Sequence, residues 1–426
     1  MKNITISAPE KLANCTIKLP SSKSISNRVL IVNALSYSPY EVQNISPSDD
    51  TKVMLEVLNS DGNKFDIGAA GTSMRFLTAF LSKVVGEWTI TGSERMKQRP
   101  IKVLVDALIE LGAKIEYPEV EGYPPLKILG SNLEGKKLTL PGNISSQYIS
   151  ALLMIGPTIT NGLEIELTGE IISKPYIHLT LKIMREFGAQ CEMKGNLITI
   201  KESAYKPIQY SVESDWSAAS YWYQILALSN NWTDKVTLLG LQSESGQGDS
   251  KVADLFKQFN IKTTFSKQGV TLEKHDFSFK KSLPAGAPKE QKKMEYNFID
   301  QPDLAQTFVV TCCFTNTHFE FTGLQSLKIK ETDRITALIT ELAKFGYKIS
   351  TNNINSMSWN GEMVEKHEKI KTEKISVATY KDHRMAMAFA PVCQVVGKFK
   401  IEDIEVVAKS YPAYWEDLKM AGFGVK

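Results

Sequence analysis

The sequence predicts an α/β protein of two similar halves, and three observations support this prediction. The first is a recurring phrase in which an amphipathic stretch ends in apolar residues, followed by a turn residue and then by alternating apolar residues. The second is its spacing of about 80 residues, which is too long for a solenoid repeat. The third is that three copies precede residue 230 and three follow it. Helix–glycine–strand is common in α/β proteins, but six instances favour a repeated module.

Each copy predicts a helix that a left-handed residue ends, followed by a strand of period two. The clearest copies run from Leu108 to Tyr117, from Met184 to Met193 and from Leu342 to Ser350. A weaker copy covers Met54 to Ile67, and the stretch from Lys274 to Lys293, rich in Lys, Ser, Pro and Gly, is expected to be a solvated excursion. The residues expected to end the helices are Gly112, Gly188, Asn260, Gly346 and Gly422.

Length and composition exclude several classes of function. The 426 residues, 42% of them hydrophobic, allow two or three domains of usual size and are typical of a soluble globular protein. With 50 basic and 47 acidic side chains, the net charge of +3 gives no support for binding nucleic acid or an acidic membrane surface. No apolar run approaches the ~18 residues of a membrane span, and the N-terminus MKNITISAPE lacks the features of a secretory signal.

Cysteine and histidine are few and scattered. The five cysteines are odd in number and include no C-x-x-C pair, which suits a reduced cytosol and argues against a disulfide framework or a thiolate zinc site. None of the five histidines forms H-x-x-x-H or H-E-x-x-H. We therefore expect a cytoplasmic protein without a metal centre.

The first motif, LPSSKSISNR (Leu19 to Arg28), gathers hydroxyl, ammonium and guanidinium donors at the start of an expected helix. A helix N-terminus adds free backbone N–H groups and the positive end of the dipole, so these residues suit an anion. The motif is not a Walker A loop, because G-x-x-x-x-G-K-[ST] is absent. A serine cap with solvated cations would explain any one of Lys23, Ser24 and Arg28, but explains the three together less well.

Four further motifs of the first half place small, cationic or hydroxyl residues before helices. GAAGTSMRF (Gly68 to Phe76) allows close approach of a ligand to the backbone, although a tight helix–helix contact explains its glycines equally well. RMKQRP puts cations before a helix that Pro100 is suited to begin, where they oppose the helix dipole unless an anion intervenes. NISSQ and SKPY supply hydroxyls that bind phosphate or merely cap a helix, and each alone is weak.

The second half adds acidic residues among the cations. Charge runs of this kind are most often solvated faces. Mixed charges crowded at the starts of apolar helices argue against that interpretation here, because burial makes isolated charges costly. The residues concerned are Asp303, Lys330, Glu331, Asp333, Arg334, Asp382, His383, Arg384 and Lys409.

Taken in order, these motifs resemble those of the 5-enolpyruvylshikimate-3-phosphate synthases (3-phosphoshikimate 1-carboxyvinyltransferases), a family of enolpyruvyl transferases. SKSISNR, AGTSMR, RMKQRP, SSQ, SKPY, PDLA, KETDR, DHRMAM and AKSYP occur in the family's order and at compatible spacings over essentially the whole chain. Any one of these motifs would be weak, whereas nine in sequence are highly specific.

The resemblance implies two similar globular domains, each of three βαβαββ units in an inside-out α/β barrel, hinged by two crossovers. One domain is expected over residues 20–228 and a second, discontinuous one over residues 1–19 plus 229–426, with the active site in the cleft between them. The family transfers the enolpyruvyl group of phosphoenolpyruvate to the 5-hydroxyl of shikimate 3-phosphate, in the pathway to chorismate and the aromatic amino acids. No metal or organic cofactor is implied, and we expect a monomer whose partners are these two small molecules.

The resemblance also carries site residues over, position by position. The residues implied to bind phosphoenolpyruvate are Lys23, Gly71, Arg99, Gln147, Arg334, Arg384 and Lys409. Those implied to bind shikimate 3-phosphate are Ser24, Arg28, Ser145, Ser146, Gln147, Ser173, Tyr176, Asp303, Ser326 and Lys330. Of these, the serines would take the phosphate and Arg28 the ring carboxylate.

The same resemblance implies the catalytic roles. Asp303 is expected to be the base toward the 5-hydroxyl and Glu331 the proton donor to the methylene carbon, while Lys23 and Lys409 stabilise the departing phosphate. Positioned acids and bases contribute roughly 10²–10⁴-fold each. Affinity for phosphoenolpyruvate and response to the inhibitor glyphosate do not follow by analogy, because the chain departs from the common pattern at four positions: Ser21, Ala69, Phe76 and Ser326.

Two other functions stay open on the sequence alone. One is the sister enolpyruvyl transferase that acts on UDP-N-acetylglucosamine; that family uses a loop cysteine, and no cysteine lies in a comparable loop between Lys83 and Ser93. The other is a non-catalytic phosphometabolite-binding protein that has kept the fold. Such a protein should tolerate the loss of its acids, yet Asp303 and Glu331 are both present.

The distribution of arginine indicates small polyanions as ligands. Every arginine of the chain except Arg185 lies inside one of the recognised motifs. The planar guanidinium matches a carboxylate or a phosphate through two hydrogen bonds, which lysine cannot copy.

Overall fold

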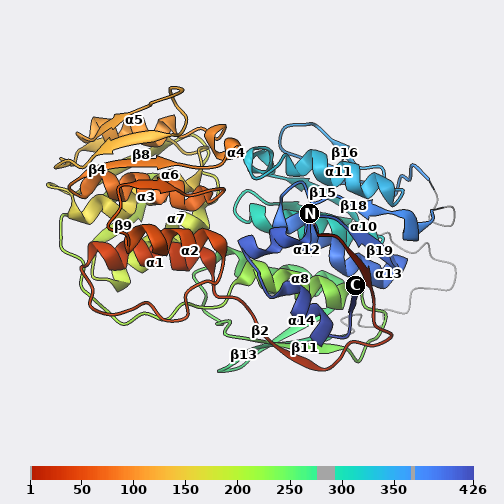
Figure 1. The fold of residues 1–426 in the computed structure, drawn as a ribbon. Coiled ribbons are helices and arrows are strands. Elements are labelled where there is room, and N and C mark those ends of the chain that lie inside the picture. Colours follow the sequence, from red (N-terminus) through yellow and green to blue (C-terminus); the bar gives the residue numbers. More distant parts are fainter. Residues whose placement is uncertain (1, 276–292, 366–369) are drawn as a thin grey trace. The chain divides into compact units, whose positions relative to one another are not determined.

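The chain folds into two compact units, and the second is inserted into the first. The computed structural model describes residues 2–275, 293–365 and 370–426 (Figure 1). Unit 1 consists of Met1–Pro20 and Ser214–Lys426, and unit 2 of Ser21–Glu213. Of the predicted solvated excursion, residues 276–292 lie outside the described part of the chain.

The second boundary between the units falls at Ser214, whereas the family resemblance places it after residue 228. Helix α8 (Trp216–Leu228) makes the difference, because its side chains belong to the core of unit 1. All of them except Ser217 are buried, and a helix that is apolar all round is stable only inside a core. The backbone N–H of its N-cap, Asp215, donates to the carbonyl of Pro20 at 2.9 Å, so the helix is also tied to the N-terminal segment of that unit.

One sheet topology recurs through both units. Each of the four-stranded sheets among the described residues begins with a parallel pair, and two antiparallel pairings follow. In unit 2 the sheet orders are β3 (Lys64–Asp66), β4 (Glu87–Thr91), β6 (Leu126–Leu129), β5 (Lys114–Glu116), and β7 (Lys137–Pro141), β8 (Leu163–Thr168), β10 (Leu197–Ile200), β9 (Cys191–Lys194).

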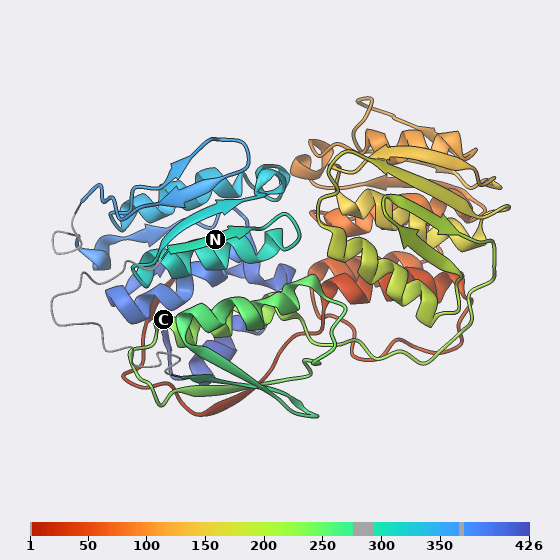
Figure 2. The ribbon, with the colours of Figure 1, turned by 180° about the vertical axis from the view of Figure 1, so that it is seen from behind.

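Unit 1 repeats this topology three times, with strands drawn from both ends of the chain (Figure 2). Its sheet orders are β14 (Lys293–Asn297), β15 (His318–Thr322), β17 (Met357–Trp359), β16 (Ser350–Thr351); β2 (Cys15–Lys18), β11 (Lys235–Leu239), β13 (Gly269–Lys274), β12 (Ile261–Phe265); and β18 (Ser376–Val377), β19 (Phe399–Ile401), β1 (Ile4–Ser7), β20 (Gly424–Val425).

The third module of unit 2 is the exception. Its strands are reduced to a parallel bridge between Gln43 and Ser211, held by the hydrogen bonds of Gln43 with Tyr210 (2.8 Å) and Val212 (3.1 Å). The described residues therefore contain five modules with a full sheet and a sixth without one.

The predicted helix ends are confirmed. Gly112, Gly188, Gly346 and Gly422 have φ between 86° and 101°, and Asn260 has φ 63°. After each of these glycines the next N–H bonds five residues back, as Ala113 does to Leu108 at 2.9 Å, which is the Schellman pattern. The weaker copy differs: α2 (Asp49–Leu58) ends at Asn59 with φ −102°, and the following β3 pairs in parallel rather than antiparallel.

Helices form the interior of each unit and the sheets form its outer layers. Nearly every residue of α3 (Gly71–Lys83), α6 (Ser146–Ile155) and α10 (Ala305–Phe314) is buried, whereas β7 and β8 bury alternate residues only. The inside-out arrangement expected from the resemblance is therefore confirmed. The remaining α-helices are α1 (Lys23–Leu35), α4 (Glu94–Lys97), α5 (Lys102–Glu110), α7 (Lys174–Glu186), α9 (Val252–Leu255), α11 (Arg334–Lys344), α12 (His383–Phe389), α13 (Cys393–Val396) and α14 (Tyr414–Met420). Among the described residues, none of the helices has the length and apolarity that crossing a membrane requires.

Candidate active site

In unit 2 the N-termini of four helices lie together. Arg28 in α1 donates from Nε to the Thr180 hydroxyl in α7 (2.8 Å) and from Nη2 to the Ser150 hydroxyl in α6 (3.1 Å). At the start of α6, the Gln147 amide donates to the Thr72 hydroxyl at the start of α3 (3.0 Å). Because each of these residues lies in the first two turns of its helix, free N–H groups and positive dipole ends gather at one end of the unit.

Arg28 is a buried cation, 2% exposed, without an acidic partner among the described residues. Its Nη1 donates to the carbonyl of Ser24 at 2.8 Å, and the rings of Phe76 and Tyr176 lie 5.3 and 5.8 Å from its guanidinium carbon. Burial lowers the pKa of Arg28 to about 10, although Tyr176 opposes the shift. An anion beside this guanidinium would stabilise its charged form.

The glycine-rich motif brings a second guanidinium against the backbone. A Cβ at Gly71 would lie 2.5 Å from Nη1 of Arg99, so this close approach requires glycine. Arg75, one turn into α3, donates to the carbonyls of Gly71 and Pro100, each at 3.1 Å. The Tyr148 hydroxyl donates to the same Pro100 carbonyl. Arg75 thus ties the start of α3 to the loop that carries Arg99.

Lys23 is the first residue of α1, and its ammonium lies 3.4 Å from the carboxylate of Asp50. The Asp50 side chain is 6% exposed and lies in the first turn of α2. Sequence reasoning missed Asp50, although the run Ser48, Asp49, Asp50 is a signature of a helix start.

The predicted serines occupy helix starts as well. The Ser145 hydroxyl accepts from the N–H of Gln147 and so caps α6, while Ser24 and Ser146 lie in the first turns of α1 and α6. Ser173 precedes α7 with φ 54°, a left-handed conformation that is uncommon for serine, and its hydroxyl makes no capping hydrogen bond. The hydroxyl of Ser173 is therefore not used to hold its own helix.

In unit 1 one arginine holds three carboxylates. Arg334, the first residue of α11 and 1% exposed, contacts Asp303 (Nη1–Oδ1 3.2 Å), Glu331 (Nη2–Oε2 3.0 Å) and Asp382 (Nε–Oδ2 2.6 Å). Burial acts to lower the pKa of Arg334, but the three carboxylates outweigh it and raise that pKa. We refer to the following residues as the acid–base cluster: Asp303, Lys330, Glu331, Arg334, Asp382, Arg384 and Lys409.

Asp303 is surrounded by cations. Its Oδ2 lies 2.9 Å from Nη2 of Arg384, and its Oδ1 lies 3.5 Å from the ammonium of Lys330. Burial acts to raise the pKa of Asp303, but the charges of Arg384, Lys330 and Arg334 outweigh it and hold that pKa well below the usual value. Arg384 is oriented further by its Nη1, which donates to the Tyr221 hydroxyl at 3.3 Å. Asp303 is therefore an ionised carboxylate at neutral pH.

Glu331 bridges the arginine to a lysine. Its Oε2 accepts from Arg334, while its Oε1 lies 2.9 Å from Nζ of Lys409. The side chains of Glu331 and Lys409 are 14% and 13% exposed, respectively. A carboxylate and an ammonium at this distance can pass a proton between them.

A further carboxylate near the cluster was missed by the sequence analysis. Asp249 is 4% exposed and accepts from the Ser217 hydroxyl. Burial, followed by the charge of Asp303, raises the pKa of Asp249 to about 7, although Arg384 opposes the shift. Nothing in the local sequence GQGDSK distinguishes this aspartate from a surface one.

The structure brings most of the predicted residues of each unit together, with some exceptions. Ser326 lies in a 3-10 helix, Gln325–Ile329, and makes no hydrogen bond to the acid–base cluster in the described part of the chain. Lys97 forms an ion pair with Glu119 at 3.1 Å, and Arg95 is exposed to solvent. These two cations of the motif therefore lie at the protein surface. Arg185 donates to the carbonyl of Cys191 at 3.0 Å. No group of His, Cys, Asp or Glu placed to hold a metal ion occurs among the residues that the structure describes.

Comparisons with known proteins identify relatives over the whole chain. The family model of EPSP synthase (3-phosphoshikimate 1-carboxyvinyltransferase) matches residues 7–63 and 59–418. A Bacteroides fragilis (strain YCH46) protein named 3-phosphoshikimate 1-carboxyvinyltransferase is 51% identical over 422 residues, which are 99% of this chain and 98% of that protein. A protein of the same name from Haemophilus influenzae (strain KW20 / Rd) is 35% identical over 459 residues, with 98% and 99% covered.

A solved structure agrees at the level of the fold. The EPSP synthase of Acinetobacter baumannii, solved at 2.37 Å, matches with a TM-score of 0.76 at 19% identity, and all of both chains is covered. The fold and the family match thus define a two-unit α/β transferase with repeated βαβαββ modules. Within that class, the chain belongs to the EPSP synthase family.

Proposed function

We propose that this chain transfers the enolpyruvyl group of phosphoenolpyruvate to the 5-hydroxyl of shikimate 3-phosphate and releases phosphate. The proposal gives it a place in the shikimate pathway to chorismate and the aromatic amino acids. The observation that supports it best is the acid–base cluster, where Arg334 binds the carboxylates of both Asp303 and Glu331. The cluster supplies two acids for two proton transfers, with Lys330 beside one and Lys409 beside the other.

Unit 2 would hold the anionic ends of the substrates. Arg28 is the group for the ring carboxylate of shikimate 3-phosphate, since it is buried, charged and without a carboxylate of its own in the described chain. Ser145, Ser146 and Ser173, at the starts of α6 and α7, would take the 3-phosphate through hydroxyl and backbone N–H donors. Arg99, which lies against Gly71, would bind phosphoenolpyruvate.

Unit 1 would carry out the proton transfers. Asp303 is held ionised by Arg384, Lys330 and Arg334, which gives the protonation state of a base but leaves it weakly basic. An anionic substrate that binds to those cations would neutralise part of their charge and so raise the basicity of Asp303. The carboxylate then takes the proton of the 5-hydroxyl as the oxygen attacks phosphoenolpyruvate.

Glu331 and Lys409 would act on phosphoenolpyruvate, at its methylene carbon and its phosphate. In the addition, Glu331 gives a proton to the methylene carbon of phosphoenolpyruvate; in the elimination, it takes one back from the resulting methyl group. Lys409, 2.9 Å from Glu331, and Lys23 stabilise the phosphate as it leaves. Preorganised cations opposite a developing charge can contribute more than the proton transfers themselves.

The proposal requires that residues of both units contact the same substrates, because the groups assigned to shikimate 3-phosphate include Arg28 in unit 2 and Lys330 in unit 1. Binding should therefore draw the units around the ligand. Small-angle scattering with and without shikimate 3-phosphate should show a smaller radius of gyration in its presence. An unchanged radius at saturation would count against a site shared by both units.

The direct test is phosphate release from phosphoenolpyruvate with each of two acceptors. Shikimate 3-phosphate should support turnover, and UDP-N-acetylglucosamine should not. Turnover with the UDP-sugar alone would overturn the proposal, and binding of shikimate 3-phosphate without turnover would instead leave a phosphometabolite-binding protein. The Arg185→Met variant, altered in an exposed arginine outside the motifs, serves as the matched control and should keep full activity.

A further inference from the structure

The segment that leads into α12 has an unusual backbone. Tyr380 and Lys381 are consecutive non-glycine residues with φ of 54° and 58°, in the left-handed region that is unfavourable for residues with a Cβ. Directly after them comes Asp382, which is fully buried, binds Arg334, and caps α12 by accepting from the N–H of Arg384 at 2.9 Å. The positions of Asp382 and Arg384 in the acid–base cluster therefore depend on a backbone conformation that the residues themselves do not favour.

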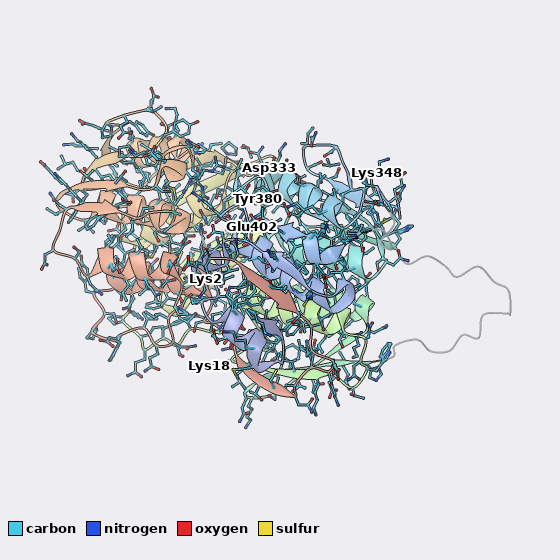
Figure 3. The ribbon with its side chains drawn as sticks, turned by 45° about the vertical axis from the view of Figure 1, so that its right-hand side comes forward. Lys2, Lys18, Asp333, Lys348, Tyr380 and Glu402 are labelled. Atoms are coloured by element: carbon cyan, nitrogen blue, oxygen red, sulfur yellow. The ribbon has the colours of Figure 1, made fainter. Side chains whose placement is uncertain are left out.

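A buried carboxylate holds this segment. Glu341 in α11 is fully buried; its Oε1 accepts from the Tyr380 hydroxyl at 2.6 Å and its Oε2 from the backbone N–H of Ala378 at 3.1 Å. Lys344, one turn further along α11, lies 2.6 Å from the same Oε2 and donates to the carbonyl of Ser376 at 2.8 Å. Figure 3 labels Tyr380 and also Asp333, the N-cap of α11.

One helix therefore grips the segment at two points. At its N-terminus Arg334 binds Asp382, and about two turns later Glu341 binds Ala378 and Tyr380. The left-handed pair, Tyr380 and Lys381, lies between Ala378 and Asp382, and Tyr380 is itself bound to Glu341. Glu341 is not among the residues that the family resemblance assigns to either substrate, and no hydrogen bond or ion pair joins it to Asp303, Glu331 or Lys409 among the described residues.

We propose that Glu341, acting through Tyr380 and Ala378, is a positioning residue that sets the place of Arg384 and Asp382 for binding phosphoenolpyruvate. The inference rests on the proposed function, because it takes phosphoenolpyruvate to be the ligand of Arg384. We call the hydrogen bonds of Glu341 to Tyr380 and Ala378 the clamp. Without the clamp, the two left-handed residues relax and the first turn of α12 changes its conformation. Arg384 then loses its position opposite Asp303 and Tyr221. Glu341 itself touches no substrate, so the chemical step should be affected less than the binding of this one ligand.

Two variants test the clamp. Tyr380→Phe removes one hydrogen bond from a ring that is 38% exposed, so that it should fold normally. Glu341→Gln keeps the shape of the side chain but replaces one carboxylate oxygen by an NH₂ group. That group is a donor and faces a donor, either the N–H of Ala378 or the Tyr380 hydroxyl. Loss of such contacts corresponds to about 3- to 10-fold per hydrogen bond. We expect KM for phosphoenolpyruvate to rise by this factor in Tyr380→Phe and further in Glu341→Gln, with KM for shikimate 3-phosphate and kcat within about twofold.

Controls separate positioning from general stability. Tyr37→Phe, at a tyrosine that is 94% exposed, should leave every parameter unchanged. Lys381→Gly removes the cost of one left-handed position and should restore part of the phosphoenolpyruvate affinity of Glu341→Gln. Affinity for phosphoenolpyruvate, in the presence of saturating shikimate 3-phosphate, is also measured by calorimetry, so that a variant with low turnover is still informative.

The outcomes are distinct. If the wild-type chain turns over neither acceptor, the proposed function fails, whatever the variants do. If the wild type is active and both Tyr380→Phe and Glu341→Gln bind phosphoenolpyruvate normally, the clamp is refuted. It is also refuted if the variants lose affinity for both substrates in parallel with a lower unfolding midpoint, because that pattern is the signature of a merely structural carboxylate.

Discussion

Replacing Arg28 with methionine should strongly weaken binding of shikimate 3-phosphate without destabilising the free protein. The guanidinium is fully buried, and the lowering of its pKa to about 10 corresponds to about 3 kcal/mol by which burial disfavours its charged form. Methionine removes that cost. The hydroxyls of Thr180 and Ser150, which lose Arg28 as a donor, still bond each other at 2.8 Å, so neither hydroxyl is left without a partner.

The two effects should be measured separately. In urea, Arg28→Met should unfold with a free energy within about 1 kcal/mol of the wild type or above it, because replacing a buried charge by an apolar side chain is often neutral or stabilising. By calorimetry its Kd for shikimate 3-phosphate should rise at least ~30-fold, since loss of one partner of a buried charge pair costs about 2–5 kcal/mol. The matched control, Arg185→Met, should leave this Kd unchanged.

One combination of results would refute this reasoning. If Arg28→Met lost more than about 3 kcal/mol of stability while it kept its affinity for shikimate 3-phosphate, Arg28 would be a structural cation satisfied by its own hydrogen bonds. The aromatic rings of Phe76 and Tyr176 would then be sufficient counterparts for the charge.

Glu331→Gln should slow phosphate release roughly 10²-fold or more while Kd for shikimate 3-phosphate stays within about twofold; unchanged turnover would remove Glu331 from the proton transfers. Gly71→Ala places a Cβ 2.5 Å from the Arg99 guanidinium and should raise KM for phosphoenolpyruvate about 10-fold or more, whereas Gly62→Ala, in an exposed turn, should not; equal effects in the two would show that no ligand-binding geometry depends on Gly71. Burial and a neighbouring carboxylate raise the pKa of Asp249 to about 7, so the folded state retains a proton that the unfolded chain loses near pH 4. Stability should therefore fall as pH rises from about 4 through 7, and Asp249→Asn should flatten this dependence in urea midpoints taken at pH 5.5 and 8.5; an unchanged slope would assign it to other groups.

Local chemistry made the helix ends and the motif residues predictable from the sequence. Gly112 and Asn260 end helices because few residues adopt the left-handed conformation, and that preference needs no tertiary information. Lys23 and Arg334 could be recognised for a similar reason, since each begins a helix within a short run of charged or hydroxyl residues. Of the six arginines inside the motifs, Arg28, Arg75, Arg334 and Arg384 are buried, whereas Arg95 is exposed and Arg99 is partly buried.

Features that depend on tertiary packing could not be predicted from the sequence. The side chains that accept hydrogen bonds from Arg28 are those of Ser150 and Thr180, each more than a hundred residues away along the chain, and nothing in their local sequence marks them as its partners. The apolar sequence of helix α8 indicates that it is buried but not in which unit, and only its packing places it with unit 1. The pKa of Asp249 is set by its burial and by Asp303, which a sequence reveals only when the fold is known.

The pairing of the first strand has a consequence for how the protein is made. Strand β1 lies between β19 and β20, with Ile4 opposite Ile401 and Ser7 opposite Gly424. On the ribosome these residues must wait for almost the entire chain, which takes roughly 20–80 s at ordinary rates of synthesis. Unit 2, whose residues are contiguous, has all of its contacts available halfway through. Nascent chains should therefore carry a finished inner unit while the N-terminal strand still presents unpaired edges, and that interval is when the chain most needs protection from aggregation.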